Sequence, residues 1–165
     1  MRALYDSKSK GNDRGIKKLL TKEAKIESWL LAEAALADAQ AEEGFIPRSA
    51  ADNIIENAKL ERIDLEEMDR IQAKVGHGFV PFVKVLVKAC SEEGGKYVHY
   101  GVTTQNIQQT GQLYVTYKIH RIFQSYVADI QDHLGDLAEA HAETVMPGRT
   151  HGRHAIPITY GYKVS

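Results

Sequence analysis

The stretch QNIQQTGQLYVTYKIHRIFQSYVADIQDHLGDLAEAHAET, residues 105–144, contains no proline and predicts one very long helix. At 1.5 Å per residue, roughly 40 residues make a rod of about 60 Å, whereas a compact globule of 165 residues has a radius of gyration of about 15 Å. The rod must therefore project from its own domain, and we expect helices from further sequence or from other subunits to cover it. Its ladder of residues at helical spacing is Ile107, Tyr114, Tyr117, Ile122, Tyr126, Ile130, Leu137 and His141.

Shorter helices are predicted ahead of this segment. The first covers residues 16–43, where apolar side chains recur at helical spacing and Gly44 supplies a C-terminal stop. A short second helix, through residue 58, is opened by the capping-box pair of Ser49 and Asp52. Each helix presents one apolar face, as expected in a small helical domain.

Two more helices precede the long one. Asp64 and Glu67 repeat the capping-box spacing, and Gly76 marks the end of the helix that they open. The next helix starts near Pro81, because the missing N–H of proline costs nothing at a first helical position. It is predicted to end at Gly94.

The fold class expected from this pattern is all-α. We predict an irregular arm at 1–15, an N-terminal helical domain at 16–103 and, at 104–165, the start of a central bundle of long helices. Brief alternating stretches at 97–100 and 156–162 are too short, and too close to glycine or proline, to predict strands. Because a new helix is expected to begin close to the end of the sequence, the chain is expected to be a truncated N-terminal fragment.

The composition argues against several classes of function. The formal net charge is −1, from 21 basic and 22 acidic residues, which gives no overall field for nucleic acid or an anionic membrane. No stretch approaches the roughly 20 apolar residues that a membrane span needs. The one cysteine, Cys90, cannot form an intrachain disulfide, and the N-terminus has no signal-peptide pattern, so the cytoplasm is the expected compartment.

Histidines and small polar residues gather at three junctions between predicted helices, at 76–78, 99–106 and 148–154. In the second junction, Thr103 and Thr104 stand at the start of the long helix. Free backbone N–H groups and the helix dipole favour a carboxylate or a phosphate there, and the hydroxyls add donors. This junction is therefore a candidate anion site.

The third junction concentrates Arg149, Thr150, His151 and Arg153 ahead of Pro157, which is interpreted as another helix start. Glycines beside these residues allow the backbone to approach a ligand closely. Together, the second and third junctions can clamp a polyanionic substrate.

Each junction also has a purely structural interpretation. One of the threonines caps the long helix whatever the function, and the arginines can be solvated surface charges. His77, His99 and His154 can equally serve caps and packing. No zinc-ligand spacing and no nucleotide-binding glycine motif occurs, so neither a metal site nor a cofactor is expected.

The second and third junctions resemble motifs of the fumarase/aspartase superfamily. Residues 99–107, HYGVTTQNI, resemble its segment His-Tyr-Gly-x-Thr-Ser-x-Asp-Ile. Residues 148–161, GRTHGRHAIPITYG, resemble Gly-Arg-Thr-His-Gly-Gln-x-Ala-x-Pro-x-Thr-Phe-Gly. The stretch from Trp29 to Pro47 resembles the first helix of the adenylosuccinate lyase and carboxymuconate cycloisomerase branch.

This resemblance implies a lyase that cleaves a bond beta to a carboxylate, usually releasing fumarate, with each active site built from three subunits of a homotetramer. The substrate would be a small dicarboxylate. The family's base is a serine in a Gly-Ser-Ser loop, and this chain has no Ser-Ser pair, so it is expected to be inactive alone. The implied roles are general acid for His151, supporting roles for His77 and His99, carboxylate binding for Thr103, Thr104 and Thr150, and further substrate contacts for Arg149, Arg153 and Asn106.

Three positions depart from the family pattern. Thr104 replaces a serine, Asn106 an aspartate and Arg153 a glutamine. Arg153 favours an additional negative group or a different substrate shape. An adenylosuccinate lyase-like enzyme of purine nucleotide biosynthesis is the first expectation. A 3-carboxy-cis,cis-muconate cycloisomerase-like enzyme of aromatic degradation and a non-catalytic helical oligomerisation module remain the alternatives.

Overall fold

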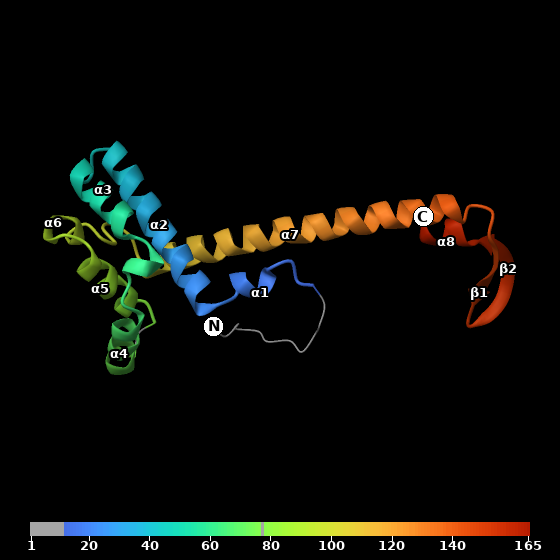
Figure 1. The fold of residues 1–165 in the computed structure, drawn as a ribbon, viewed down its shortest axis with the longest axis horizontal. Coiled ribbons are helices and arrows are strands. Elements are labelled where there is room, and N and C mark those ends of the chain that lie inside the picture. The colour runs from blue at the N-terminus through green and yellow to red at the C-terminus, as the bar shows by residue number, and fades with distance from the viewer. Residues whose placement is uncertain (1–11, 77) are drawn as a thin grey trace. The chain divides into compact units, whose positions relative to one another are not determined.

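The structure is a computed structural model that describes residues 12–76 and 78–165, and it is mostly helical, as the sequence predicts. The described residues form two compact units, one up to Ile119 and one from His120 to Ser165. Figure 1 shows the elements in chain order. They are α1 (Ile16–Leu19), α2 (Lys22–Glu42), α3 (Arg48–Asn57), the 3₁₀ turn η1 (Leu60–Arg62), α4 (Leu65–Val75), α5 (Val80–Ala89), α6 (Glu92–Gly95), α7 (Thr104–Ala140), β1 (Val145–Thr150), β2 (Arg153–Thr159) and α8 (Tyr160–Val164).

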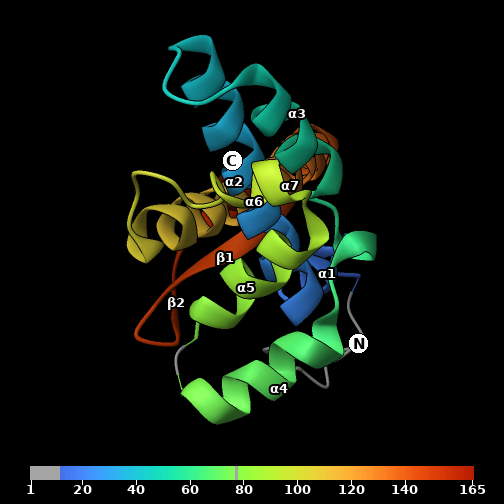
Figure 2. The ribbon, with the colours of Figure 1, turned by 90° about the vertical axis from the view of Figure 1, so that its left-hand side faces the viewer.

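The core of the first unit is built around three aromatic rings. Trp29 of α2 meets Phe79 and Phe82 edge-on, with ring centroids 5.0 and 5.4 Å apart. Helix α2 packs against α3, and α4 packs against α5, as Figures 1 and 2 show. The aliphatic side chains Ile26, Leu30, Ile54 and Leu86 belong to the same core.

The predicted helix over 16–43 is divided in two. Thr21 has extended backbone angles, and its side chain accepts a hydrogen bond from the N–H of Ala24, so α2 starts afresh at Lys22. The helix predicted from Pro81 to Gly94 is likewise broken, because Cys90 is extended and Ser91 caps the short α6.

The two predicted capping boxes have different outcomes. Asp64 caps α4 through the N–H of Glu67, as predicted. Ser49 does not cap α3, because that helix already starts at Arg48; its hydroxyl donates to Glu93 of α6 instead.

Helix α7 confirms the prediction of a very long helix, although it ends at Ala140, four residues before the predicted end at Thr144. In the first unit it crosses α2 at Gly111. A Cβ atom placed on Gly111 would lie 2.6 Å from Oγ of Ser28 and 2.9 Å from the Trp29 ring. The absent side chain therefore lets the two helices approach closely.

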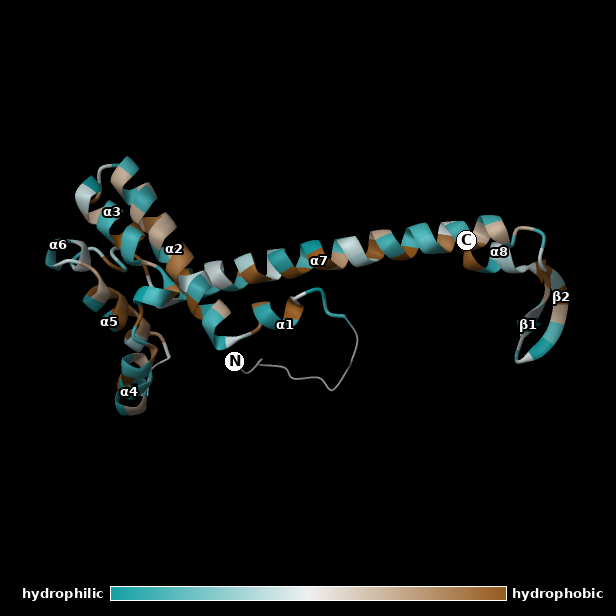
Figure 3. Ribbon diagram, viewed as in Figure 1, coloured by the Kyte–Doolittle hydropathy of each residue, from teal (hydrophilic) through white to brown (hydrophobic). Residues whose placement is uncertain are grey.

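In the second unit α7 carries an exposed apolar stripe, and Figure 3 shows hydrophobic residues along this helix. The spacing of the stripe alternates between four and three residues, the pattern of a helix that packs against another helix. The stripe consists of Phe123, Val127, Ile130, Leu134 and Leu137, which are 38–56% exposed.

The interpretation of Pro157 as a helix start is wrong, because Pro157 lies in a strand. The residues after α7 also add two strands to the fold that was expected to be all-α. β1 and β2 form an antiparallel hairpin in which Pro157 pairs with Pro147, and the next helix, α8, begins only at Tyr160. The reason is the turn at His151 and Gly152, where φ is +47° and +76°. Two successive positive φ values give a turn that matches the twist of paired strands.

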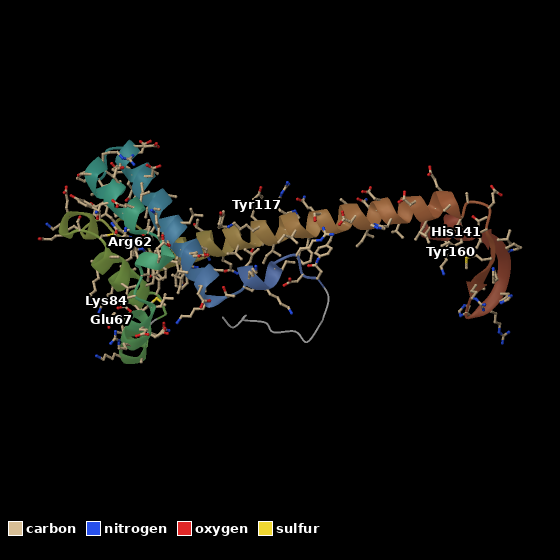
Figure 4. The ribbon with its side chains drawn as sticks, in the orientation of Figure 1. Arg62, Glu67, Lys84, Tyr117, His141 and Tyr160 are labelled. Atoms are coloured by element: carbon tan, nitrogen blue, oxygen red, sulfur yellow. The ribbon has the colours of Figure 1, made fainter. Side chains whose placement is uncertain are left out.

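Helix α8 packs back against the end of α7. The N–H of Gly161 donates to the carbonyl of His141, and a Cβ atom on Gly161 would lie 2.9 Å from Cα of Ala142. The rings of His141 and Tyr160, labelled in Figure 4, meet edge-on at 5.2 Å. These contacts fix the base of the hairpin.

Candidate active site

The loop ahead of α7 places His99 against a buried carboxylate. The backbone N–H of His99 donates to Oε2 of Glu33 over 3.1 Å, and Nδ1 of its ring lies 2.6 Å from Oε1. The Glu33 side chain is 1% exposed and the His99 side chain 17%. Burial raises the pKa of the Glu33 carboxyl, and its hydrogen bonds with His99 act in the opposite direction.

Two residues of this loop have a positive φ, a backbone conformation that residues with a side chain rarely adopt. His99 has φ of +60°, and Gly101 follows with +71°. The side-chain amide of Gln40 in α2 donates to the carbonyl of Tyr100 over 2.8 Å. Helix α2 therefore supports the loop through Glu33 and Gln40.

At the start of α7, Asn106 closes the first turn. Its Oδ1 accepts from the N–H of Thr103 over 3.0 Å, while its own N–H donates to the Thr103 carbonyl over 2.9 Å. This reciprocal pairing uses the Asn106 side chain as part of the helix cap. Thr103 is exposed and Thr104 is half-buried, so both stand at the surface where the expected anion would bind.

The residues of the third junction lie on the hairpin. His151 occupies the two-residue turn, with Thr150 and Arg153 paired on either side of it. Opposite residues of an antiparallel pair share a face, so Thr150 and Arg153 lie on one face, and Arg149 and His154, which are also paired, on the other. All five side chains are exposed.

One contact supports the turn. The Arg149 guanidinium donates to the carbonyl of Gly152 over 3.3 Å. Arg149 therefore reaches across the turn that carries His151.

The predicted site residues thus fall into two groups. His99, Thr103, Thr104 and Asn106 belong to the first unit, and the hairpin residues belong to the second. His77 lies outside the described residues. A hollow of about 470 Å³ beside Trp29 and Gln112 in the first unit is lined by none of the predicted site residues.

In residues 12–76 and 78–165, no cluster of three or more histidine, cysteine or acidic side chains is arranged to hold a metal ion. Within the same ranges, no helix is both long enough and apolar enough to cross a membrane.

Sequence reasoning missed Glu33 and Gln40. The signal was present, because Glu33 continues the apolar series Ile26, Leu30 and Ala37 at helical spacing along α2. A carboxylate on a buried stripe needs a partner. The Oε1 atom of Gln40 is buried and has no hydrogen-bond partner in the described part of the chain.

The sequence is similar to those of known lyases. The sequence model of the lyase family matches residues 7–165. Adenylosuccinate lyase of Methanocaldococcus jannaschii is 38% identical over 148 residues, which are 90% of this chain and 32% of that protein. N-acetyl-S-(2-succino)cysteine lyase of Enterococcus italicus is 38% identical over 143 residues, 87% of this chain and 31% of that protein.

Solved structures give the same result. Beta-carboxy-cis,cis-muconate cycloisomerase from Acinetobacter calcoaceticus matches with a TM-score of 0.85 and 33% identity, over 92% of this chain and 36% of that one. Fumarate lyase from Mesorhizobium sp. matches with a TM-score of 0.86 and 32% identity, over 97% of this chain and 37% of that one.

The chain spans about a third of the length of the curated relatives it matches. The matched range, residues 7–165, includes both the His99 loop and the hairpin. The chain therefore belongs to the lyase family of the fumarase/aspartase superfamily and corresponds to the N-terminal region of its members.

Proposed function

We propose that the protein containing this chain is a lyase that eliminates fumarate from a succinyl adduct, with adenylosuccinate as its substrate. The observation that carries the proposal is the 38% identity to an adenylosuccinate lyase over 90% of the chain. The family match over residues 7–165 includes both loops that hold the candidate site residues. The substrate is thus a small dicarboxylate, and no cofactor takes part.

The proposed chemistry divides between the two loops. His151, exposed at the hairpin turn, protonates the leaving group, a role that suits an imidazole near neutral pH. Hydroxyls of Thr103, Thr104 and Thr150 bind substrate carboxylates, with charge from Arg149 and Arg153 beside them. His77 and His99 assist at the substrate, and Asn106 shapes the first turn of α7. The base is supplied from outside this chain.

We propose that the two loops meet in a homo-oligomer, a tetramer in the family pattern. The exposed stripe on α7 supports this assembly, because apolar residues with helix-packing spacing are left uncovered in a single chain. The His99 loop of one subunit and the hairpin of another then face the same substrate.

A carboxymuconate cycloisomerase activity is the second candidate. The TM-score of 0.85 with a cycloisomerase favours it. Arg153, in place of the glutamine expected from the resemblance, also favours a substrate with a different distribution of negative charge.

The purified full-length protein can be tested on the substrates of the relatives that the chain resembles. Adenylosuccinate, N-acetyl-S-(2-succino)cysteine and 3-carboxy-cis,cis-muconate are supplied separately, and absorbance in the ultraviolet follows product formation. Fumarate release from adenylosuccinate, faster than turnover of the other two, is the expected result. Turnover of carboxymuconate alone would replace the first proposal with the second.

His151→Asn in the full-length protein tests the general acid. Asparagine followed by glycine is well suited to a turn with two positive φ values, so the hairpin is expected to stay intact. Loss of the acid is expected to slow elimination by roughly 100-fold or more. His133→Ala, an exposed histidine with no assigned role and outside the apolar stripe, is the matched control and is expected to keep normal turnover. Normal turnover in His151→Asn would remove His151 from the mechanism.

A further inference from the structure

Glu33 is an unusual residue to find in the core of this chain. It lies on the buried face of α2, and its side chain is only 1% exposed. Removing a carboxylate from water is strongly unfavourable unless partners replace the lost hydration. Apolar side chains alone would suffice for packing at this position of α2. The carboxylate of Glu33 must therefore have a specific partner.

Both hydrogen bonds of the Glu33 side chain in the described part of the chain go to one residue, His99, 66 positions further along the sequence. One carboxylate oxygen accepts from the backbone N–H and the other pairs with Nδ1 of the ring. The first contact holds the backbone of the loop at a residue with φ of +60°. The second fixes the rotation of the imidazole.

A third contact holds the imidazole ring of His99. The ring of Phe79 lies against the ring of His99, with centroids 5.3 Å apart and planes tilted by 46°. Exposure rises from 1% at the Glu33 side chain to 17% at His99. The imidazole therefore stands at the boundary between the core and the surface of the loop.

We propose that Glu33 is a positioning residue for His99: it keeps the proton on Nδ1 and so leaves Nε2 as the nitrogen that acts on the substrate. A carboxylate can only accept a hydrogen bond, so its partner nitrogen must donate. The hydrogen bond at one imidazole nitrogen determines the state of the other. Glu33 thus determines both the direction and the tautomer of the ring.

The proposal rests on the proposed lyase function for its catalytic consequence, but not for the geometry. If Glu33 served only to anchor the loop, any hydrogen-bonding group of the same size would replace it. If it sets the tautomer, a group that donates where the carboxylate accepts must change the ring.

Glu33→Gln makes this distinction in the full-length protein. The amide keeps the size of the side chain and one acceptor oxygen, which can still bind the N–H of His99. Its NH₂ group would face Nδ1 and force that nitrogen to accept, which moves the ring proton to Nε2. Glu33→Asp keeps the carboxylate on a shorter side chain. Glu27→Gln, an exposed glutamate of the same helix, is the matched control.

The first measurement is the ¹⁵N spectrum of the histidine rings, with His99 assigned by its absence in His99→Gln. In the unaltered protein Nδ1 of His99 is expected to carry a proton, and in Glu33→Gln the proton is expected on Nε2. An unprotonated Nδ1 in the unaltered protein would overturn the proposal. This result needs no substrate to be turned over, and the decisive state is that of the unaltered protein.

The second measurement is turnover of the accepted substrate. Glu33→Gln is expected to lower kcat by about 10- to 100-fold per folded enzyme, with a much smaller change in KM, and Glu33→Asp to recover part of the loss. Unchanged kcat per folded enzyme in Glu33→Gln would show a merely structural role. Inactivity of the unaltered protein on every substrate, with the expected spectrum, would reject the lyase proposal and keep the tautomer assignment.

Discussion

Cys90, at the end of α5, shows how burial determines the chemistry of a single residue. Partial burial raises the pKa of its thiol from 9.0 to about 11. Because the pKa of the thiol is higher in the folded protein than in the unfolded one, the folded state is favoured while the thiol is neutral. It is fully present below pH 9.0 and is lost as the pH rises through about 11.

The reactivity of this thiol follows. At pH 8 the folded protein should contain roughly 100-fold less Cys90 thiolate than a thiol with the ordinary pKa, and the thiolate is the nucleophile. Alkylation by iodoacetamide, followed by mass spectrometry, should therefore be much slower in the folded protein than in the urea-unfolded one. Equal rates in the two states would contradict the assigned pKa.

The candidate site was partly predictable residue by residue. The glycines and hydroxyls of the loops made Thr103 and His151 candidates, and the resemblance to the family added a role for His99. Glu33 was missed because it stands alone in an apolar helix, and its partner is 66 residues away. Local patterns cannot reveal a contact across that separation. A charged residue within an apolar stripe does indicate, however, that some partner must lie nearby.

Among the elements, the crossing of α2 and α7 at Gly111 makes the sharpest prediction. Gly111→Ala places a methyl group 2.6 Å from Oγ of Ser28 and 2.9 Å from the Trp29 ring. We expect a loss of about 1–3 kcal/mol in the free energy of unfolding, measured by urea titration.

Gly135 provides the comparison for this substitution. It lies in the same helix, and a Cβ atom there would meet nothing within 4 Å. Gly135→Ala should therefore stabilise the protein by about 0.5–1 kcal/mol, since alanine is the better helix former. If both substitutions changed stability equally, close packing at Gly111 would not be the cause.

Elements were predictable where one physical signal dominated. Helix α7 follows from a long stretch without proline, and α4 from Asp64 at its start and Gly76 at its end. The hairpin was missed because its turn depends on a left-handed backbone at His151, and histidine is a weaker indication of that conformation than asparagine. With the turn unrecognised, Pro157 was interpreted as the start of a helix.

For the whole molecule, the apolar stripe on α7 predicts dependence on assembly. Ile130→Asp places a charge in the middle of the stripe, whereas Ala128→Asp adds the same charge two positions away on the exposed surface of the helix. Burying an unpaired carboxylate in a subunit interface is unfavourable, so only Ile130→Asp should dissociate the proposed oligomer.

Sedimentation velocity would measure the mass of each variant, and lyase assays would be run beside it. Activity is expected to fall together with the mass in Ile130→Asp and to persist in Ala128→Asp. An intact oligomer in both variants would mean that the stripe lies outside the interface.

The narrow turn of the hairpin also restricts how this sequence can change in length. Only His151 and Gly152 separate the paired residues Thr150 and Arg153. Because side chains alternate between faces along a strand, a single inserted codon at the turn would carry Arg153 and His154 to the opposite side. Further along, the register already shifts between Pro147 and Arg149, where the pairing can absorb a change in length. During divergence, side chains at the turn can be exchanged one at a time, but insertions and deletions between Thr150 and Arg153 should be rejected.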